Sequence, residues 1–321
     1  MSMEFGNLAG SIAGDGRITA EEILELRRLG WADGKMDPEE AEALFTANDG
    51  CAAPTSEWCD FFVEALSTFI VNTVEPKGYV DDEMADELIS RIDRDGRVGS
   101  MAELELLVKV SEMALNVPGQ LKAYALKHIE DAVLHGEGPT RHGELTPKGI
   151  NETECALLRR LIFAPASDRP AAVSKLEAEM LFRIKDATLY EINASGWEKL
   201  FVQGVANYLL GFGGSEPLTH ERAAELEAFM NKDGAGIGGF LGRMLTSKPN
   251  LDGAFGSLLK DPELLADWDD QADAAAGLDL AEASWLQDML DADEELDSLE
   301  AALIAFVDEE TGGQFVPRPQ G

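Results

Sequence analysis

Two stretches of this sequence resemble each other closely: ITAEEILELRRL at residues 18–29 and INETECALLRRL at residues 150–161. Both begin with Ile and end with Leu-Arg-Arg-Leu. Three further pairs follow in the same order: AEALF at 41–45 with AEMLF at 178–182, SEWCDFFVEAL at 56–66 with SGWEKLFVQGV at 195–205, and VDDEMADELISRIDRDG at 80–96 with LTHERAAELEAFMNKDG at 218–234. The preserved order predicts a duplicated domain in which Trp58 corresponds to Trp197.

The hydrophobic pattern within these blocks is helical. Ile23, Leu26 and Leu29 share one helix face, and no run of alternating strand pattern occurs. Helix starts are marked by pairs with capping-box spacing: Thr19 with Glu22, Asp37 with Glu40, Ser100 with Glu103, Asn151 with Glu154, and Ser174 with Glu177. The sequence therefore predicts an all-α fold: two tandem copies of a helical-bundle domain plus an acidic, partly helical C-terminal segment.

Composition places the expected boundaries. The first copy spans residues 1–135 and the second spans 150–248, and residues 136–149 between them are rich in Gly, Pro and polar side chains, as in a solvated linker. Residues 249–321 form the acidic C-terminal segment, in which acids far outnumber bases. We expect both copies to stay folded without this segment.

Apolar residues recur at near-helical spacing within that acidic segment. A tail that only increases solubility does not need them, so we expect them to contact either the rest of the chain or another protein. The predicted partner-binding residues are Trp285, Leu286, Leu290, Leu299, Leu303 and Phe306.

The formal net charge of -35 limits the classes of partner. Such a surface repels nucleic-acid phosphates and anionic membranes, so we expect no nucleic acid, no membrane, and a basic protein as the favoured partner. The three cysteines have no zinc or disulfide spacing, which fits a reducing compartment. The N-terminus lacks the pattern of a secretory signal, and we expect a cytoplasmic location.

An Asp-Gly-x-apolar tetrad occurs three times, ending at Ile18, Met36 and Val98. Aligned on a calcium-binding EF-hand loop, these tetrads supply carboxylates as candidate metal ligands at some of the required positions. The candidate ligands are Asp15, Glu22, Asp33, Glu40, Asp93 and Asp95. No single loop provides a full set of oxygen ligands, and helix capping explains the same residues without a metal.

The short helices separated by these tetrads, as in ITAEEILELRRL and ADGKMDPEEAEALF, resemble the TerB-like helical domains of the tellurite-resistance family. The resemblance implies a small helical bundle in each copy, with acidic loops that bind cations. The second copy departs from the pattern, because Ala-Pro-Ala-Ser-Asp at 164–168 replaces the second Asp-Gly loop.

Signatures of catalysis are missing from the sequence: there is no GxSxG, Walker A, HExxH or catalytic-cysteine pattern. The repeated His-Gly-Glu at 135–137 and 142–144 could bind a transition metal, but a solvated linker is the favoured interpretation. Our leading hypothesis is a non-catalytic interaction or regulatory scaffold, for which the sequence indicates no definite cofactor, with Ca²⁺ or another divalent cation as the candidate. The alternatives are a protein that responds to Ca²⁺ or another divalent cation and a metal-dependent hydrolase.

Overall fold

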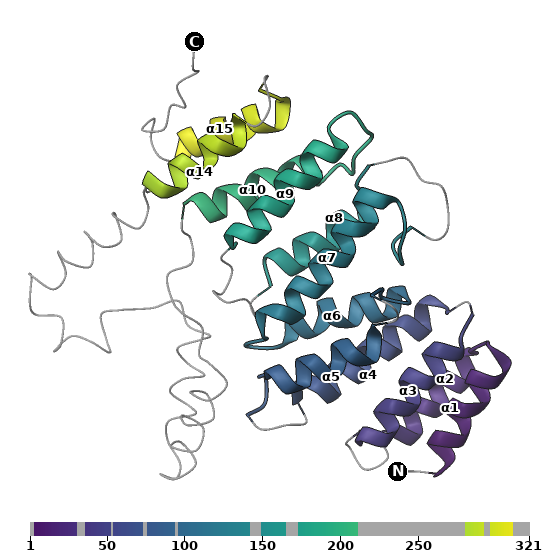
Figure 1. The fold of residues 1–321 in the computed structure, drawn as a ribbon. Coiled ribbons are helices and arrows are strands. Elements are labelled where there is room, and N and C mark those ends of the chain that lie inside the picture. The colour runs from purple at the N-terminus through teal and green to yellow at the C-terminus, as the bar shows by residue number, and fades with distance from the viewer. Residues whose placement is uncertain are drawn as a thin grey trace, which may run out of the picture.

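The computed structural model describes residues 3–30, 36–52, 54–72, 76–93, 96–141, 149–164, 173–210, 280–291 and 296–310. The described part is all-α, as the sequence predicts. Apart from isolated bridges from Tyr79 to Asn116 and from Asp93 to Val98, it has no strand pairing. Figure 1 shows the helices stacked from the N-terminal group at lower right to the C-terminal pair at upper left.

We call α1–α7 the first half and α8–α15 the second half. The helices of the first half are α1 (Met3–Asp15), α2 (Ala20–Gly30), α3 (Pro38–Gly50), α4 (Ser56–Asn72), α5 (Asp82–Ile92), α6 (Met101–Met113) and α7 (Gly119–His135). Those of the second half are α8 (Glu152–Ile162), α9 (Lys175–Thr188), α10 (Trp197–Leu209), α14 (Leu280–Leu290) and α15 (Ser298–Glu310).

The N-terminal helix α1 is a structural element that the sequence patterns above do not predict. Its residues Phe5, Ala9 and Ile12 are buried and face the core. The helix packs closely on α3, where a side chain at Gly50 would lie within 2.4 Å of the Cα atom of Ala13. Glycine at this position therefore permits the close approach of the two backbones.

Corresponding aromatic side chains pack in the same way in the two halves. Edge-to-face contacts join Phe45 to Phe62 at 5.4 Å and Phe182 to Phe201 at 5.2 Å between ring centroids. Trp58 lies 5.9 Å from Phe62, and Trp197 lies 6.2 Å from Phe201. These matched contacts support the expected duplication, which superposition of the halves would test. The fourth sequence pair cannot be compared, because residues 218–234 lie outside the described residues.

Helix starts also correspond between the halves. Three of the predicted boxes have reciprocal hydrogen bonds as the sequence indicates: Asp37 with Glu40, Asn151 with Glu154, and Ser174 with Glu177. Thr19 and Glu22 make the same pair of bonds before α2. Each such cap contributes about 1 kcal/mol by satisfying backbone N–H groups at the start of a helix.

The two halves meet along α6, α7, α8 and α9. Arg160 of α8 binds Glu105 at 2.6 Å and Glu112 at 2.7 Å, both on α6. Lys122 of α7 and Glu177 of α9 form an ion pair whose side chains are each 8% exposed. The halves are therefore joined by ion pairs whose side chains are buried or partly buried.

The first residues of the predicted linker are buried. Arg141 binds Glu154 through Nε at 2.7 Å and the carbonyl oxygen of Gly149 at 2.9 Å, and Thr140 donates to the same carboxylate at 2.8 Å. Burial raises the pKa of Glu154, against the opposing effect of hydrogen bonds from Asn151, Thr140 and Arg141. A solvated linker is therefore the wrong interpretation for residues 140–141, because their polar groups complete the start of α8.

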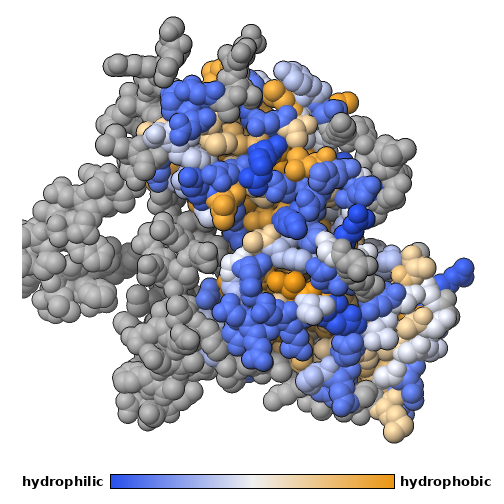
Figure 2. Space-filling view, viewed as in Figure 1, coloured by the Kyte–Doolittle hydropathy of each residue, from blue (hydrophilic) through white to orange (hydrophobic). Residues whose placement is uncertain are grey.

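Hydrophobic residues are mostly internal. Figure 2 shows one face of the molecule, which is largely hydrophilic, with the hydrophobic residues in separate small patches. Within the described ranges, no helix combines the length and apolar character needed to cross a membrane.

Candidate functional site

Two of the predicted metal ligands serve as helix caps. A carboxylate oxygen of Glu22 accepts from the backbone N–H and the hydroxyl of Thr19, at 2.9 and 2.8 Å. Glu40 accepts from the backbone N–H of Asp37 at 3.1 Å. These bonds account for both glutamates without a cation, as the capping interpretation expects.

Asp93 organises the third Asp-Gly loop. Its carboxylate accepts from the backbone N–H of Gly96 at 2.7 Å and from the hydroxyl of Tyr124 at 3.3 Å. Gly96 has φ +80°, which a residue with a side chain rarely adopts. Asp93 therefore connects Gly96 to Tyr124 of α7.

The remaining predicted ligands cannot be placed. Asp33, Asp95 and the side chain of Asp15 lie outside the described residues. Among the side chains that are described, no three or more of His, Cys, Asp or Glu are grouped so as to hold a metal ion. Cation binding by the Asp-Gly loops stays a prediction.

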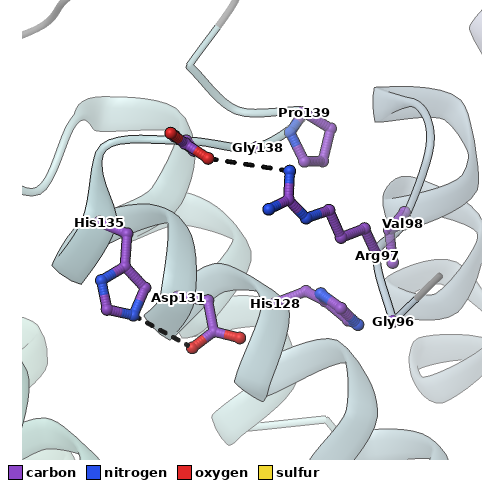
Figure 3. Close-up of a pocket in the computed structure, with 9 residues that line it drawn as sticks. Gly96, Arg97, Val98, His128, Asp131, His135, Gly138 and Pro139 are labelled. Atoms are coloured by element: carbon purple, nitrogen blue, oxygen red, sulfur yellow. Dashed lines mark ion pairs between the residues drawn. The ribbon is translucent and has the colours of Figure 1, made fainter. Parts of the chain in front are cut away.

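A pocket of about 210 Å³ opens beside the third Asp-Gly loop (Figure 3), and we call it the histidine pocket. Three segments supply its walls: the loop around Gly96, the C-terminal part of α7, and the residues that follow α7. The lining residues are Gly96, Arg97, Val98, His128, Asp131, His135, Glu137, Gly138 and Pro139. Two of the chain's four histidines thus line one cavity.

His128 forms part of the pocket wall. The residue is 8% exposed, and its Nε2 atom has no hydrogen-bond partner in the described structure. Its ring packs against Tyr124 with centroids 4.4 Å apart. Burial lowers the pKa of His128, which favours the neutral imidazole. The pocket is therefore lined by a histidine whose Nε2 atom is buried and has no hydrogen-bond partner among the described atoms.

Two ion pairs lie at the rim of the pocket (Figure 3). His135 Nε2 is 4.0 Å from Asp131 on the same helix. Arg97 is 3.8 Å from Glu137, and these two side chains are 79% and 73% exposed. Exposed pairs at such distances contribute little to stability, so both can rearrange at small cost.

The predicted partner-binding residues of the C-terminal segment belong to α14 and α15, which pack against α9 and α10. Trp285, Leu286, Leu290, Leu299 and Leu303 are buried, and Phe306 is half-buried. Trp285 contacts Phe182 and Tyr208 edge-to-face, at 5.8 and 4.8 Å between ring centroids. In this conformation these side chains are used within the chain, and binding a partner through them would require α14 and α15 to detach.

Lys185 of α9 fixes the start of α15. Its ammonium group is fully buried and lies 2.7 Å from carboxylate oxygens of Asp186, Asp297 and Glu300. Burial alone would lower the pKa of Lys185, but these hydrogen bonds outweigh it and raise the pKa. Asp297 and Glu300 also form the capping box of α15. The same carboxylates therefore start the helix and attach it to α9.

Comparison with models of known protein families, with curated protein sequences and with solved structures gives no match. The resemblance to TerB-like domains accordingly stays a prediction.

The histidine pocket was missed at the level of sequence. His128 and His135 are seven residues apart, which places them on the same side of one helix. That spacing is the only local signal, because Arg97 belongs to a loop that precedes α6 and approaches α7 only in the folded chain.

Proposed function

We propose that this chain is a non-catalytic scaffold whose acidic surface binds a basic protein. The observation that carries the proposal is that most basic side chains in the described ranges form ion pairs with the chain's own acids. Among these pairs are Arg27 with Glu64, Arg28 with Glu25, Arg91 with Glu42 and Asp49, Lys122 with Glu177, Arg141 with Glu154, Arg160 with Glu105 and Glu112, Arg183 with Glu130, and Lys185 with Asp297 and Glu300.

The chain has a large surplus of carboxylates over basic groups. The chain has 61 acidic and 26 basic residues, and the pairs consume bases and acids in similar numbers. The surplus creates a negative potential that attracts a basic protein and speeds its association. The same potential disfavours nucleic acid and anionic lipid, as the composition already indicates.

An ordered loop between α9 and α10 offers a contact point for such a partner. Tyr190 is 95% exposed and Ile192 is 87% exposed, and the exposed acids Glu191 and Glu152 lie in or beside the loop. Exposed aromatic and aliphatic side chains next to charges are typical of interaction surfaces. A partner with an apolar depression and a lysine- or arginine-rich rim would complement this loop.

The loop holds its shape without covering those two side chains. Asn193 accepts from the Ile150 backbone N–H at 3.0 Å and donates to the Thr188 carbonyl at 2.9 Å. Ala194 donates to the Ile150 carbonyl at 2.8 Å, and Ser195 donates to Glu152. A loop that is already ordered loses little conformational entropy on binding, which favours recognition.

Capture from extracts of the native cell tests this proposal. The immobilised full-length chain is compared with the loop variant Tyr190→Ser/Ile192→Ser. The control variant is Leu24→Ser/Leu176→Ser, which replaces two exposed leucines outside the loop. We expect a basic partner that the control retains, that the loop variant loses, and that salt releases between about 0.1 and 0.5 M. A partner that is insensitive to salt, or one that the loop variant binds as well as the control does, would contradict the proposal.

A further inference from the structure

We propose that the face formed by α9 and α10 is a binding site for an acidic amphipathic helix, which α14 and α15 occupy as an internal ligand (Figure 1). The external partner that this face fits is a helix of another protein. Its first turn carries an Asp and a Glu three residues apart, and aliphatic residues follow along one side. The proposal does not depend on the scaffold function, and it concerns a partner of the opposite charge.

Lys185 makes the site selective for an acidic helix. Its side chain is fully buried, and its ammonium group lies 2.7 Å from carboxylate oxygens of both Asp297 and Glu300 at the start of α15. The third carboxylate beside it, that of Asp186, comes from α9 itself. A buried charge without a partner is costly, so whatever covers Lys185 has to bring carboxylates.

The two carboxylates from α15 belong to the start of a helix. Asp297 accepts from the backbone N–H of Glu300 at 2.9 Å, and Glu300 accepts from the backbone N–H of Asp297 at 3.0 Å. A helix that begins with Asp-x-x-Glu holds both side chains in this arrangement by itself. Leu299, Leu303 and Val307 follow at intervals of four residues and are buried. The site therefore recognises features that a helix of another chain can also present.

The aromatic part of the site is filled imperfectly by α14. Trp285 lies edge-to-face on Phe182 and Tyr208, at 5.8 and 4.8 Å between ring centroids. Its Nε1 atom is buried and has no hydrogen-bond partner among the described atoms. An unpaired buried N–H reduces the stability of the docked segment. An external helix with Phe or Leu at this place avoids that cost and can displace α14.

No short turn joins α14 to the helix on which it packs. About 70 residues separate the end of α10 at Leu209 from the start of α14 at Leu280. The corresponding step in the first half, from Asn72 of α4 to Asp82 of α5, takes about ten. Contacts rather than a tight connection therefore keep α14 and α15 on the site, and a helix that makes the same contacts competes with them.

The probe for this site is a fluorescent peptide with the sequence of residues 280–310, added to the full-length chain. The substitutions Asp297→Asn/Glu300→Gln in the chain weaken its internal ligand and leave the site unchanged. We expect this variant to bind the peptide at least about tenfold more tightly than the unsubstituted chain does, because charge-assisted hydrogen bonds of the competitor are lost. Fluorescence anisotropy gives the two dissociation constants.

A second variant covers the case in which the first does not fold. Trp285→Ala weakens the docking of α14 and leaves Lys185 with its carboxylates, and it should also increase the affinity for the peptide. The control Asp288→Asn/Asp291→Asn removes two charges at exposed positions outside the capping box and should leave the affinity unchanged. A peptide that itself carries Asp297→Asn/Glu300→Gln should bind at least about tenfold more weakly, because it cannot pair with Lys185.

Four outcomes would overturn the inference. The first is no gain in affinity for the peptide in either variant. The second is an equal gain in the control, which would mean that net charge alone decides. The third is hydrogen-exchange protection by the peptide outside α9 and α10. The fourth is a dimer of the unsubstituted chain that exchanges α14 and α15, which would assign the site to a second copy. None of these outcomes bears on the capture of a basic partner, so the two proposals fail independently.

Discussion

α3 in the first half and α9 in the second carry corresponding side chains that have different partners. Asn48 of α3 donates to Ser100, the N-cap of α6, at 3.2 Å and accepts from Trp58 Nε1 at 3.1 Å. Lys185 lies seven residues after Ala178, the first residue of the AEMLF block, just as Asn48 lies seven residues after Ala41 in the AEALF block. Lys185 binds Asp297 and Glu300 at the start of α15. A lysine cannot accept a hydrogen bond, and Trp197 Nε1 accordingly has no partner in the described structure.

The comparison indicates which helices close each half. α6 packs on α4, and α15 packs on α10. The fourth residue of each capping sequence, Glu103 and Glu300, is fully buried. Arg91 of α5 lies over the ring of Phe45, and Trp285 of α14 contacts Phe182, the corresponding ring. The C-terminal helices thus make contacts similar to those of α5 and α6: α15 lies on α10 as α6 lies on α4, and α14 contacts Phe182 as α5 contacts Phe45.

Removing the C-terminal segment gives the largest expected effect. A chain that ends at residue 279 should lose about 5 kcal/mol or more from the second half, since several buried side chains contribute about 1.5–3 kcal/mol each. This differs from the sequence-based expectation that both copies stay folded without the segment. Hydrogen exchange measures the effect, with loss of protection expected in α9 and α10 and not in α3 and α4. Equal protection of α9 and α10 in both chains would contradict the comparison.

Lys185→Met should have the next largest effect. It leaves Asp297 and Glu300 buried without their cation, and breaking a buried pair in this way costs about 3–5 kcal/mol. Urea unfolding and limited proteolysis of the α14–α15 segment measure the change. Lys199→Met is the matched control, because Lys199 is exposed on α10 and should tolerate the substitution. A Lys185→Met protein as stable as the control would show that the charged contact does not hold α15 in place.

Asn48→Ala tests the corresponding position in the first half. It leaves Trp58 Nε1 without an acceptor in a buried site, and we expect a loss of about 1–3 kcal/mol. The loss should therefore be smaller than that of Lys185→Met, because no net charge is left buried. Thermal unfolding of the two variants under the same conditions gives the order, and the reverse order would contradict the comparison.

The pH dependence of the contact between the halves should be the smallest effect. The hydrogen bond from Arg160 lowers the pKa of Glu112 below its ordinary value of 4.5. The pair therefore stabilises the folded chain above pH 4.5 and loses this contribution as the pH falls through the lowered pKa. Both side chains are about one-third exposed, so we expect about 1 kcal/mol or less. The measurement is the unfolding free energy at neutral and at acidic pH. Glu112→Gln should reduce the difference between these two values by the contribution of the Arg160–Glu112 pair. An unchanged difference would contradict this role of the pair.

Local patterns were sufficient to predict the helices and their starts. The periodicity of Ile23, Leu26 and Leu29 and the reciprocal caps at Asp37, Asn151 and Ser174 depend on residues a few positions apart, and the structure confirms the all-α class and these caps. The helix α1 was harder to recognise, because its three glycines have low helix propensity. Its stability comes from packing on α3.

The contacts that define the candidate sites join distant positions. The apolar stripe of α15 suits either the chain itself or another protein, and the contact that attaches it to the chain comes from Lys185, more than a hundred residues earlier in the sequence. The histidine pocket likewise forms only when the fold brings Arg97, which precedes α6, to the same cavity as His128 of α7. No spacing rule connects such residues, so they could be identified only from the folded chain.

The position of α15, more than a hundred residues after Lys185 of α9, has a consequence for synthesis. Ribosomes make a chain from its N-terminus, and a domain folds once its last packing element has emerged. The first half has all of its helices soon after His135 is made, whereas the second half lacks two of the three carboxylates around Lys185 until residues 297–310 leave the ribosome. During that interval Lys185 has only Asp186 beside it, and Phe182 and Tyr208 lack the contact with Trp285, so we expect a chaperone to act at this stage of synthesis.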